Sequence, residues 1–309
     1  MRLRRLLVLA GLTSSITLAA EAQPKLMTWA DLTARPAPKA TARLAYGPDP
    51  LQIVEVWRPE GKGPFPTVLM IHGGCWRSST ANLHIMDYAA EDLRRRGIAV
   101  WNIEYRGVDR PGGGYPGTFQ DVNAAADALA THAKDYALRS DKIVVLGHSA
   151  GGQLALWLAA RTTLPRNSPL RDLQRLDIAW AVSLGGLPDL ATAKEGCGDK
   201  TVASLLAGSS LADRLSDTSP ARLLPLPTPR MLIHGRLDDT APPSKGKAYV
   251  DRARQSGDIR AWSYAIPGEG HVEEIAPGSQ TWAAVTLGLD SVFHSSDGSW
   301  LLQLIAGPL

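Results

Sequence analysis

A serine lies among glycines in the stretch Gly-His-Ser-Ala-Gly-Gly, residues 147–152. This stretch joins a buried strand pattern to an apolar helix pattern, which is the setting of a nucleophile elbow. The sharp turn of an elbow requires very small residues two positions before and two positions after the serine, and Gly147 and Gly151 occupy those positions. Ser149 is therefore the candidate nucleophile, and a purely structural turn is the alternative.

A serine hydroxyl is a weak nucleophile until a base takes its proton. Of the seven histidines, His271 follows Gly-Glu-Gly directly after the last predicted strand. His72 and His234 each precede a glycine at the end of a strand, and we predict that they are structural turn residues. His271 is therefore the expected base.

The base needs a carboxylate that orients its ring and fixes the position of its proton. Hydrolases with a nucleophile elbow carry serine, acid and histidine in that order along the chain. The loop at residues 234–242 has the right place in this order and contains Asp238 and Asp239. The spacing from His234-Gly235 favours Asp238, and Asp239 is then a neighbouring carboxylate or a helix cap.

A second glycine-containing motif, His-Gly-Gly-Cys-Trp at residues 72–76, follows the first buried strand. Its glycines allow the backbone to approach a reacting carbonyl and to direct N–H groups at the oxyanion. We expect the N–H groups of Gly74, Cys75 and Ala150 to form the oxyanion hole. A glycine-rich turn without catalytic meaning is the alternative.

Three side chains are candidates for substrate contact. Trp76 either lines the acyl or leaving-group pocket or packs inside the protein. His148 adjoins the nucleophile and is expected to point away from its hydroxyl. Tyr115 lies in the loop 112–117, which lacks the lysine and hydroxyl of a phosphate-binding loop and is predicted to be a wall near the site. No zinc-ligand spacing occurs in the sequence, and neither a metal nor a cofactor is predicted.

The elements that position these residues follow a regular alternation. Strands are predicted at 52–57, 67–71, 98–103, 142–146, 179–184, 231–233 and 262–266, and helices at 83–96, 119–133, 150–161 and 281–293. This alternation predicts an α/β fold with a mostly parallel central sheet and helices on both faces. A proline-containing break at about 187–228 predicts a small lid insertion.

The N-terminus has the pattern of an export signal. Three arginines precede an apolar run, and Ala20-Glu21-Ala22 provides a small-x-small cleavage pattern. We expect a signal peptide at 1–22, with an uncleaved anchor as the alternative, and hence an exported, periplasmic or secreted protein. A Pro- and Ala-rich stretch, predicted to be a tether or a surface-wrapping arm, follows at 23–41, then a catalytic domain at 42–293 and a tail at 294–309.

Net charge and cysteine content limit the possible partners. The formal charge is +3, or +1 once residues 1–22 with three arginines and one glutamate are removed. Such a charge gives no basis for binding nucleic acid or an acidic membrane surface, and no membrane span is expected after signal cleavage. Export makes a disulfide between Cys75 and Cys197 possible, and two free thiols are the alternative. The oligomeric state is not predicted.

With these motifs the chain resembles the α/β-hydrolase superfamily from about residue 44 to 293. The form of residues 72–76 and of 112–122 resembles the kynurenine formamidase-like and feruloyl-esterase-like (BD-FAE-type) branch. The resemblance implies a serine hydrolase that cleaves small carboxylic esters through an acyl-enzyme. An arylformamidase or small-peptide amide hydrolase with the same three catalytic residues is the alternative, and a non-catalytic binding protein is a second.

Overall fold

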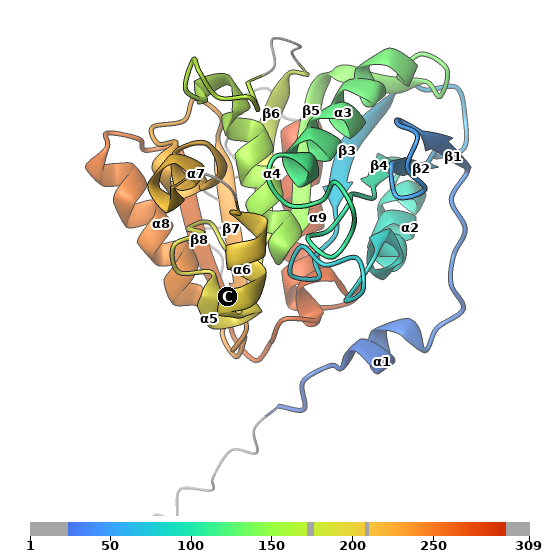
Figure 1. The fold of residues 1–309 in the computed structure, drawn as a ribbon. Coiled ribbons are helices and arrows are strands. Elements are labelled where there is room, and N and C mark those ends of the chain that lie inside the picture. Colours follow the sequence, from blue (N-terminus) through green and yellow to red (C-terminus); the bar gives the residue numbers. More distant parts are fainter. Residues whose placement is uncertain (1–23, 172–175, 208–209, 295–309) are drawn as a thin grey trace, which may run out of the picture.

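Eight strands form one sheet in the order β1-β2-β4-β3-β5-β6-β7-β8 (Figure 1). The structure, a computed structural model, describes residues 24–171, 176–207 and 210–294. The strands are β1 (Ala42–Ala45), β2 (Ile53–Trp57), β3 (Phe65–Ile71), β4 (Ala99–Ile103), β5 (Leu138–His148), β6 (Ile178–Leu184), β7 (Arg230–Gly235) and β8 (Ala261–Ile266). The pairs β1–β2 and β2–β4 are antiparallel, and all other pairs are parallel. The predicted mostly parallel sheet is confirmed.

Helices cover both faces of this sheet (Figure 1). The α-helices are α1 (Trp29–Thr33), α2 (Asp87–Arg95), α3 (Gly117–His132), α4 (Ala150–Ala160), α5 (Lys194–Cys197), α6 (Asp199–Leu205), α7 (Leu211–Thr218), α8 (Pro243–Gln255) and α9 (Gln280–His294). Short 3-10 turns are η1 (Leu83–Met86), η2 (Arg161–Thr163), η3 (Pro220–Arg222) and η4 (Glu273–Ile275). Buried side chains of α3, α4 and α8 pack on one face, and those of α2 and α9 pack on the other.

The central strands are buried on both sides because they lie between two hydrophobic cores. In β3, Leu69 and Ile71 belong to the core beneath α3 and α4, whereas Val68 and Met70 belong to the core beneath α2 and α9. Such strands have continuous apolar sequences rather than alternating ones. Because β3, β5, β7 and β8 run in the same direction, the loops that follow them meet at the carboxyl edge of the sheet.

Outside the segment 187–228, three helices or strands were not predicted, and one predicted helix is divided. The segment 83–96 forms η1 and α2 in succession, while α1, β1 and α8 are additional. The buried residues of α8, Gly246, Tyr249, Val250 and Ala253, have helical spacing, but only two of them carry large apolar side chains. A Cβ on Gly246 would lie 2.6 Å from Nε2 of His234, so glycine allows α8 to pack closely on the sheet.

The segment 187–228 between β6 and β7 carries α5, α6, α7 and η3. It lies against the carboxyl-edge loops: a Cβ on Gly196 would be 2.3 Å from the carbonyl oxygen of Thr240. The Lys245 ammonium donates to the carbonyl oxygen of Thr192 at 3.1 Å. The segment therefore packs against the loop after β7 and against α8, and its function as a lid stays a prediction.

The expected signal peptide, residues 1–22, lies outside the described residues, as do residues 295–309 of the expected tail. Among the helices that the structure describes, none combines the length and the apolar character needed to cross a membrane.

Candidate active site

Ser149 occupies a strained turn between β5 and α4. Its backbone has φ 55° and ψ −120°, a conformation that costs a non-glycine residue about 1–3 kcal/mol. A Cβ on Gly147 would lie 2.0 Å from the carbonyl oxygen of Gly151. A Cβ on Gly151 would lie 2.2 Å from the carbonyl oxygen of Ile71. Both neighbours of the turn must therefore be glycine, as the sequence argument for an elbow requires.

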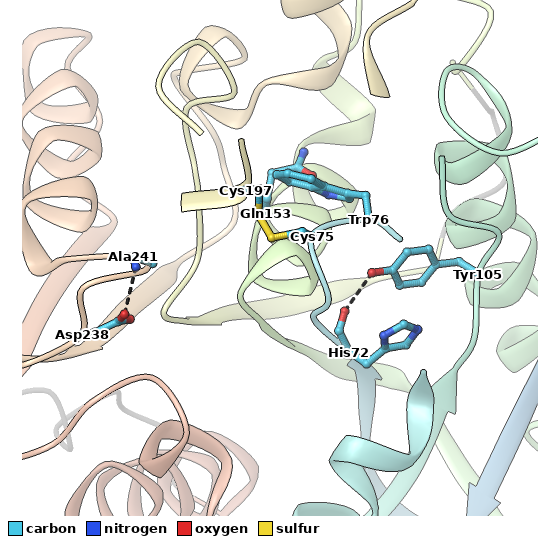
Figure 2. The surroundings of a disulfide bond; sticks show 8 residues. All are labelled: His72, Cys75, Trp76, Tyr105, Gln153, Cys197, Asp238 and Ala241. Atoms are coloured by element: carbon cyan, nitrogen blue, oxygen red, sulfur yellow. Dashed lines mark hydrogen bonds between the residues drawn. A yellow bond between two sulfur atoms is a disulfide. The ribbon is translucent and has the colours of Figure 1, made fainter. Parts of the chain in front are cut away.

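His271 and Asp238 form a hydrogen-bonded pair in the loops after β8 and β7. Nδ1 of His271 lies 2.8 Å from Oδ2 of Asp238, and Oδ1 accepts the N–H groups of Thr240 and Ala241, each at 2.9 Å (Figure 2 draws the Ala241 bond). Asp239 is exposed and makes no part of this pair. An ionised carboxylate only accepts, so the imidazole proton sits on Nδ1 and leaves Nε2 as an acceptor.

The hydrogen bonds around Asp238 keep its carboxyl ionised. Burial alone would raise the pKa of Asp238. The hydrogen bond and the charge of His271, together with the Ala241 and Thr240 amides, outweigh burial and lower the pKa below its ordinary value. Asp238 is therefore a carboxylate across the neutral pH range.

His148 is a second imidazole beside His271. The two ring centroids are 4.4 Å apart, and Nε2 of His148 donates to the carbonyl oxygen of His271 at 3.0 Å. Burial is the main cause that lowers the pKa of His148 well below its ordinary value, so this ring stays neutral. The side chain lines the same cavity as Ser149.

A cavity of about 330 Å³ brings the candidate residues together. Its walls include Ser149, His271, His148, Gly74 and Cys75. Two larger hollows of about 640 and 590 Å³ lie against α2 and α8, and neither is lined by Ser149, Asp238 or His271. Ser149 and His271, the predicted nucleophile and base, thus line one specific cavity that is smaller than these two hollows.

The loop at residues 72–76 passes directly over the serine. A Cβ on Gly73 would lie 2.9 Å from Cβ of Ser149. Gly74, Cys75 and Trp76 all have positive φ, of 108°, 51° and 54°. Two consecutive non-glycine residues in the left-handed region are unusual, and such backbone persists only where its surroundings hold it.

Buried polar contacts hold the start of this loop. Nε2 of His72 lies 2.8 Å from Oε1 of Glu104, and the His72 ring stacks on Tyr105 at 4.4 Å. The Tyr105 hydroxyl donates to the carbonyl oxygen of His72 at 3.0 Å (Figure 2). These contacts agree with the structural role expected for His72. His234, whose Nδ1 lies 2.8 Å from the carbonyl oxygen of Ala241, has a comparable setting.

A disulfide between Cys75 and Cys197 holds the far part of the loop (Figure 2). The two Cα atoms are 5.4 Å apart, although 122 positions separate the residues in sequence. The bond links the loop above the serine to α5 of the insertion. Of the two states that the sequence left open, the structure shows the disulfide.

We predict that replacing both cysteines, in Cys75→Ser/Cys197→Ser, lowers the free energy of unfolding by about 2–5 kcal/mol. It should also reduce kcat for any reaction at Ser149, because the left-handed backbone at Cys75 loses its covalent support. Urea unfolding and turnover assays measure the two effects. Unchanged turnover together with unchanged stability, or free labelling of both thiols in the native wild type, would contradict this prediction.

Two of the candidate substrate contacts have other roles. Trp76 is fully buried in the hydrophobic core, and its Nε1 donates to Oε1 of Gln153 at 3.0 Å (Figure 2). Trp76 therefore packs inside the protein and does not line the acyl or leaving-group pocket. The Tyr115 hydroxyl donates to Asp217 at 2.9 Å, and the Arg214 guanidinium lies 3.6 Å from its ring centroid. Tyr115 thus anchors the loop 112–117 to α7 and is absent from the walls of the cavity.

The N-terminal arm forms one wall of the cavity, which sequence analysis did not foresee. Trp29 of α1 meets the rings of His148 and His271 edge-on, with centroids 5.9 and 6.4 Å apart. Leu32 is fully buried, and the Met27 N–H donates to the Glu273 carboxylate. The segment therefore wraps onto the surface rather than acting as a tether.

Glu274 is a further carboxyl at the site that the sequence analysis missed. It follows His271 by three residues and is fully buried. In the described part of the chain, Glu274 belongs to two groups of side chains whose ligand atoms lie within 4.8 Å of one another. One group adds His148 and His271, and the other adds His234 and Asp238. A third such group combines the buried carboxyls of Glu55 and Asp87 with the exposed ring of His84.

Comparisons with known proteins relate the chain to one family model and to esterases. The family model described as BD-FAE matches residues 54–252. The chain is 26% identical over 267 residues to esterase LipC of Mycobacterium tuberculosis, a match that covers 82% of this chain and only 65% of LipC.

Solved structures of low sequence identity share the fold. An inhibited esterase B from Lactobacillus rhamnosis is 19% identical with a TM-score of 0.70, and the match covers 86% of this chain and 92% of that one. A bacterial heroin esterase is 24% identical with a TM-score of 0.62, over 81% and 82% of the two chains. Together with the sheet and helices described above, these likenesses identify an α/β-hydrolase fold.

Proposed function

Because the chain belongs to the BD-FAE family, we propose that it is a serine esterase that cleaves small carboxylic esters through an acyl-enzyme. One observation carries the proposal: Ser149, in its strained turn, shares a cavity with an imidazole whose Nδ1 is bound to Asp238. The name of LipC as an esterase supports the same reaction class.

In the proposed mechanism, Ser149 attacks the ester carbonyl carbon while Nε2 of His271 takes the hydroxyl proton. Asp238 stabilises the imidazolium that forms. The carbonyl oxygen becomes an oxyanion, which the N–H groups of Gly74, Cys75 and Ala150 stabilise, each at about 2.7–4 kcal/mol. His271 returns the proton to the leaving alcohol, and water then hydrolyses the acyl-enzyme by the same steps.

The dimensions of the cavity support a small acyl group. Its volume of about 330 Å³ lies near the lower end of the range for small-molecule sites, about 300–1,000 Å³. The walls contributed by Trp29, Ala81 and Ile85 are apolar. An amide substrate would additionally require efficient protonation of a poor leaving group by His271. The ester is therefore the proposed substrate class.

We predict that p-nitrophenyl acetate is hydrolysed with a higher kcat/KM than either p-nitrophenyl octanoate or N-formylkynurenine. Steady-state assays on the wild type, with Ser149→Ala as the blank, measure all three. A higher kcat/KM for N-formylkynurenine would replace the esterase proposal with an arylformamidase that uses the same residues. Failure of all three substrates would contradict general esterase activity.

We further propose that the protein is exported. The basic and apolar N-terminal pattern supports this, and so does the disulfide, because disulfides persist mainly in oxidising compartments.

A further inference from the structure

The fully buried Glu274 has no function in the mechanism above, although it lies beside His271 and Asp238. Its Oε1 accepts the N–H of Gly235 at 2.8 Å. Its Oε2 lies 3.6 Å from Nδ1 of His271 and 3.6 Å from Nε2 of His148, with no hydrogen-bond partner assigned to it. A buried carboxyl oxygen in this position requires an explanation, because leaving a polar atom unpaired in the interior is costly.

The backbone leaves room for this carboxyl. Gly185, directly after β6, has φ 50°, and a Cβ there would lie 2.0 Å from Oε2 of Glu274. The same Cβ would lie 2.8 Å from Nδ1 of His271. Glycine at position 185 is thus what allows the Glu274 carboxyl and the His271 ring to lie side by side.

Two neighbouring carboxyls in a dry site cannot both be ionised, so they share one proton. A carboxyl oxygen of Glu274 lies within 4.8 Å of a carboxyl oxygen of Asp238. Asp238 accepts three N–H donors, from His271, Thr240 and Ala241, whereas Glu274 accepts one. The negative charge is better stabilised on Asp238, which has more hydrogen-bond donors. The shared proton therefore resides on Glu274.

The other titratable groups around Glu274 do not supply a positive charge that would reverse this order. Burial lowers the pKa values of both His148 and His234, which therefore stay neutral. Glu269 is a further carboxyl, and it accepts the N–H groups of Gln280 and Thr281 at the start of α9. Burial first, and then the charge of Asp238, raise the pKa of Glu274 well above its ordinary value.

We propose that Glu274 is a positioning residue, held as a neutral acid whose O–H donates to the Asp238 carboxylate and fixes it against His271. This inference rests on the proposed function, since it assigns a role relative to the same catalytic residues. This O–H donates to a lone pair of the Asp238 carboxylate that the N–H groups of His271, Thr240 and Ala241 do not use. An ionised Glu274 would instead place a second anion 3.6 Å from Nδ1 of His271 and compete for the ring.

The first test compares Glu274→Gln with Glu274→Ala, using Asp239→Asn as a control on an exposed carboxylate of the neighbouring loop. A glutamine amide donates to Asp238 from the same place, so Glu274→Gln should retain most of kcat. Glu274→Ala should lower kcat about 10- to 100-fold with little change in KM, because the Asp238–His271 pair loses its support. Equal losses in the two variants would overturn the proposal.

The second test measures thermal unfolding between pH 5 and 8 and does not depend on activity. In the folded protein the pKa of Glu274 is raised, whereas in the unfolded chain it is about 4.3. The folded state therefore keeps a proton that the unfolded state releases, and stability is lost as pH rises through this range. Glu274→Gln removes that loss.

The Tm of Glu274→Gln minus that of the wild type should therefore increase by about 3 °C or more from pH 5 to pH 8. A difference that stays constant or decreases with pH would show that Glu274 is ionised, and would overturn the proposal even if Glu274→Ala fails to fold. If the wild type proves inactive on esters, the proposed function fails, while this unfolding measurement still decides the protonation of Glu274.

Discussion

Ser149→Ala is expected to lower kcat for p-nitrophenyl acetate by roughly 10⁵-fold, since the acyl-enzyme cannot form without the hydroxyl. The remaining rate should come from the oxyanion donors and from substrate binding alone. Alanine fits the position sterically, because Ser149 uses a backbone conformation that the chain already imposes through Gly147 and Gly151. Turnover assays and circular dichroism of wild type and variant test this prediction together.

An unchanged circular dichroism spectrum is the necessary control, because it separates loss of chemistry from loss of fold. Retention of more than a few per cent of the wild-type kcat by a folded Ser149→Ala protein would contradict the assignment of the nucleophile. The same result would revive a structural interpretation of the turn at residues 147–152.

The second large effect is expected for Asp238→Asn, which should lower kcat by roughly 10⁴-fold. The carboxylate accepts the Nδ1–H of His271 at 2.8 Å and so keeps Nε2 free to take the serine proton. An asparagine amide that donates to Nδ1 would stabilise the opposite tautomer, with the proton on Nε2. Asp239→Asn is the matched control, because Asp239 is exposed and adjacent in sequence.

Steady-state kinetics over a range of pH separates these two variants. Asp239→Asn should keep kcat within about twofold of the wild type, as surface substitutions away from the site usually have small effects. A larger loss in Asp239→Asn than in Asp238→Asn would show that the acid had been assigned to the wrong residue.

The sequence predicts those parts of the site that depend on local structure. The turn around Ser149 requires glycines at fixed offsets, and the buried strands require continuous apolar runs, so both patterns are visible without coordinates. Parallel strands then bring the loops of His271 and Asp238 to the same edge of the sheet. This explains why all seven predicted strands are present and why these side chains lie close together.

What the sequence does not predict depends on contacts between distant segments. Trp29 reaches the cavity because the arm folds back onto the His271 loop, and no periodicity in the arm indicates that path. Glu274 has the spacing of an ordinary turn residue, and only the space left at Gly185 reveals its proximity to the His271 ring. Trp76 follows the loop glycines, but its side chain turns into the core toward Gln153. The cysteine pairing likewise depends on the fold of the insertion.

Covalent labelling with a fluorophosphonate tests the central claim most directly, because the reagent reacts with a serine only when that serine is activated as a nucleophile. Labelled protein is digested, and the modified peptide is identified by mass spectrometry. The proposed function predicts one adduct, on Ser149, which is absent from Ser149→Ala and strongly reduced in His271→Ala. A wild-type protein that remains unlabelled at Ser149, or an equal adduct in Ser149→Ala, would contradict it and favour a non-catalytic binding protein or another nucleophile.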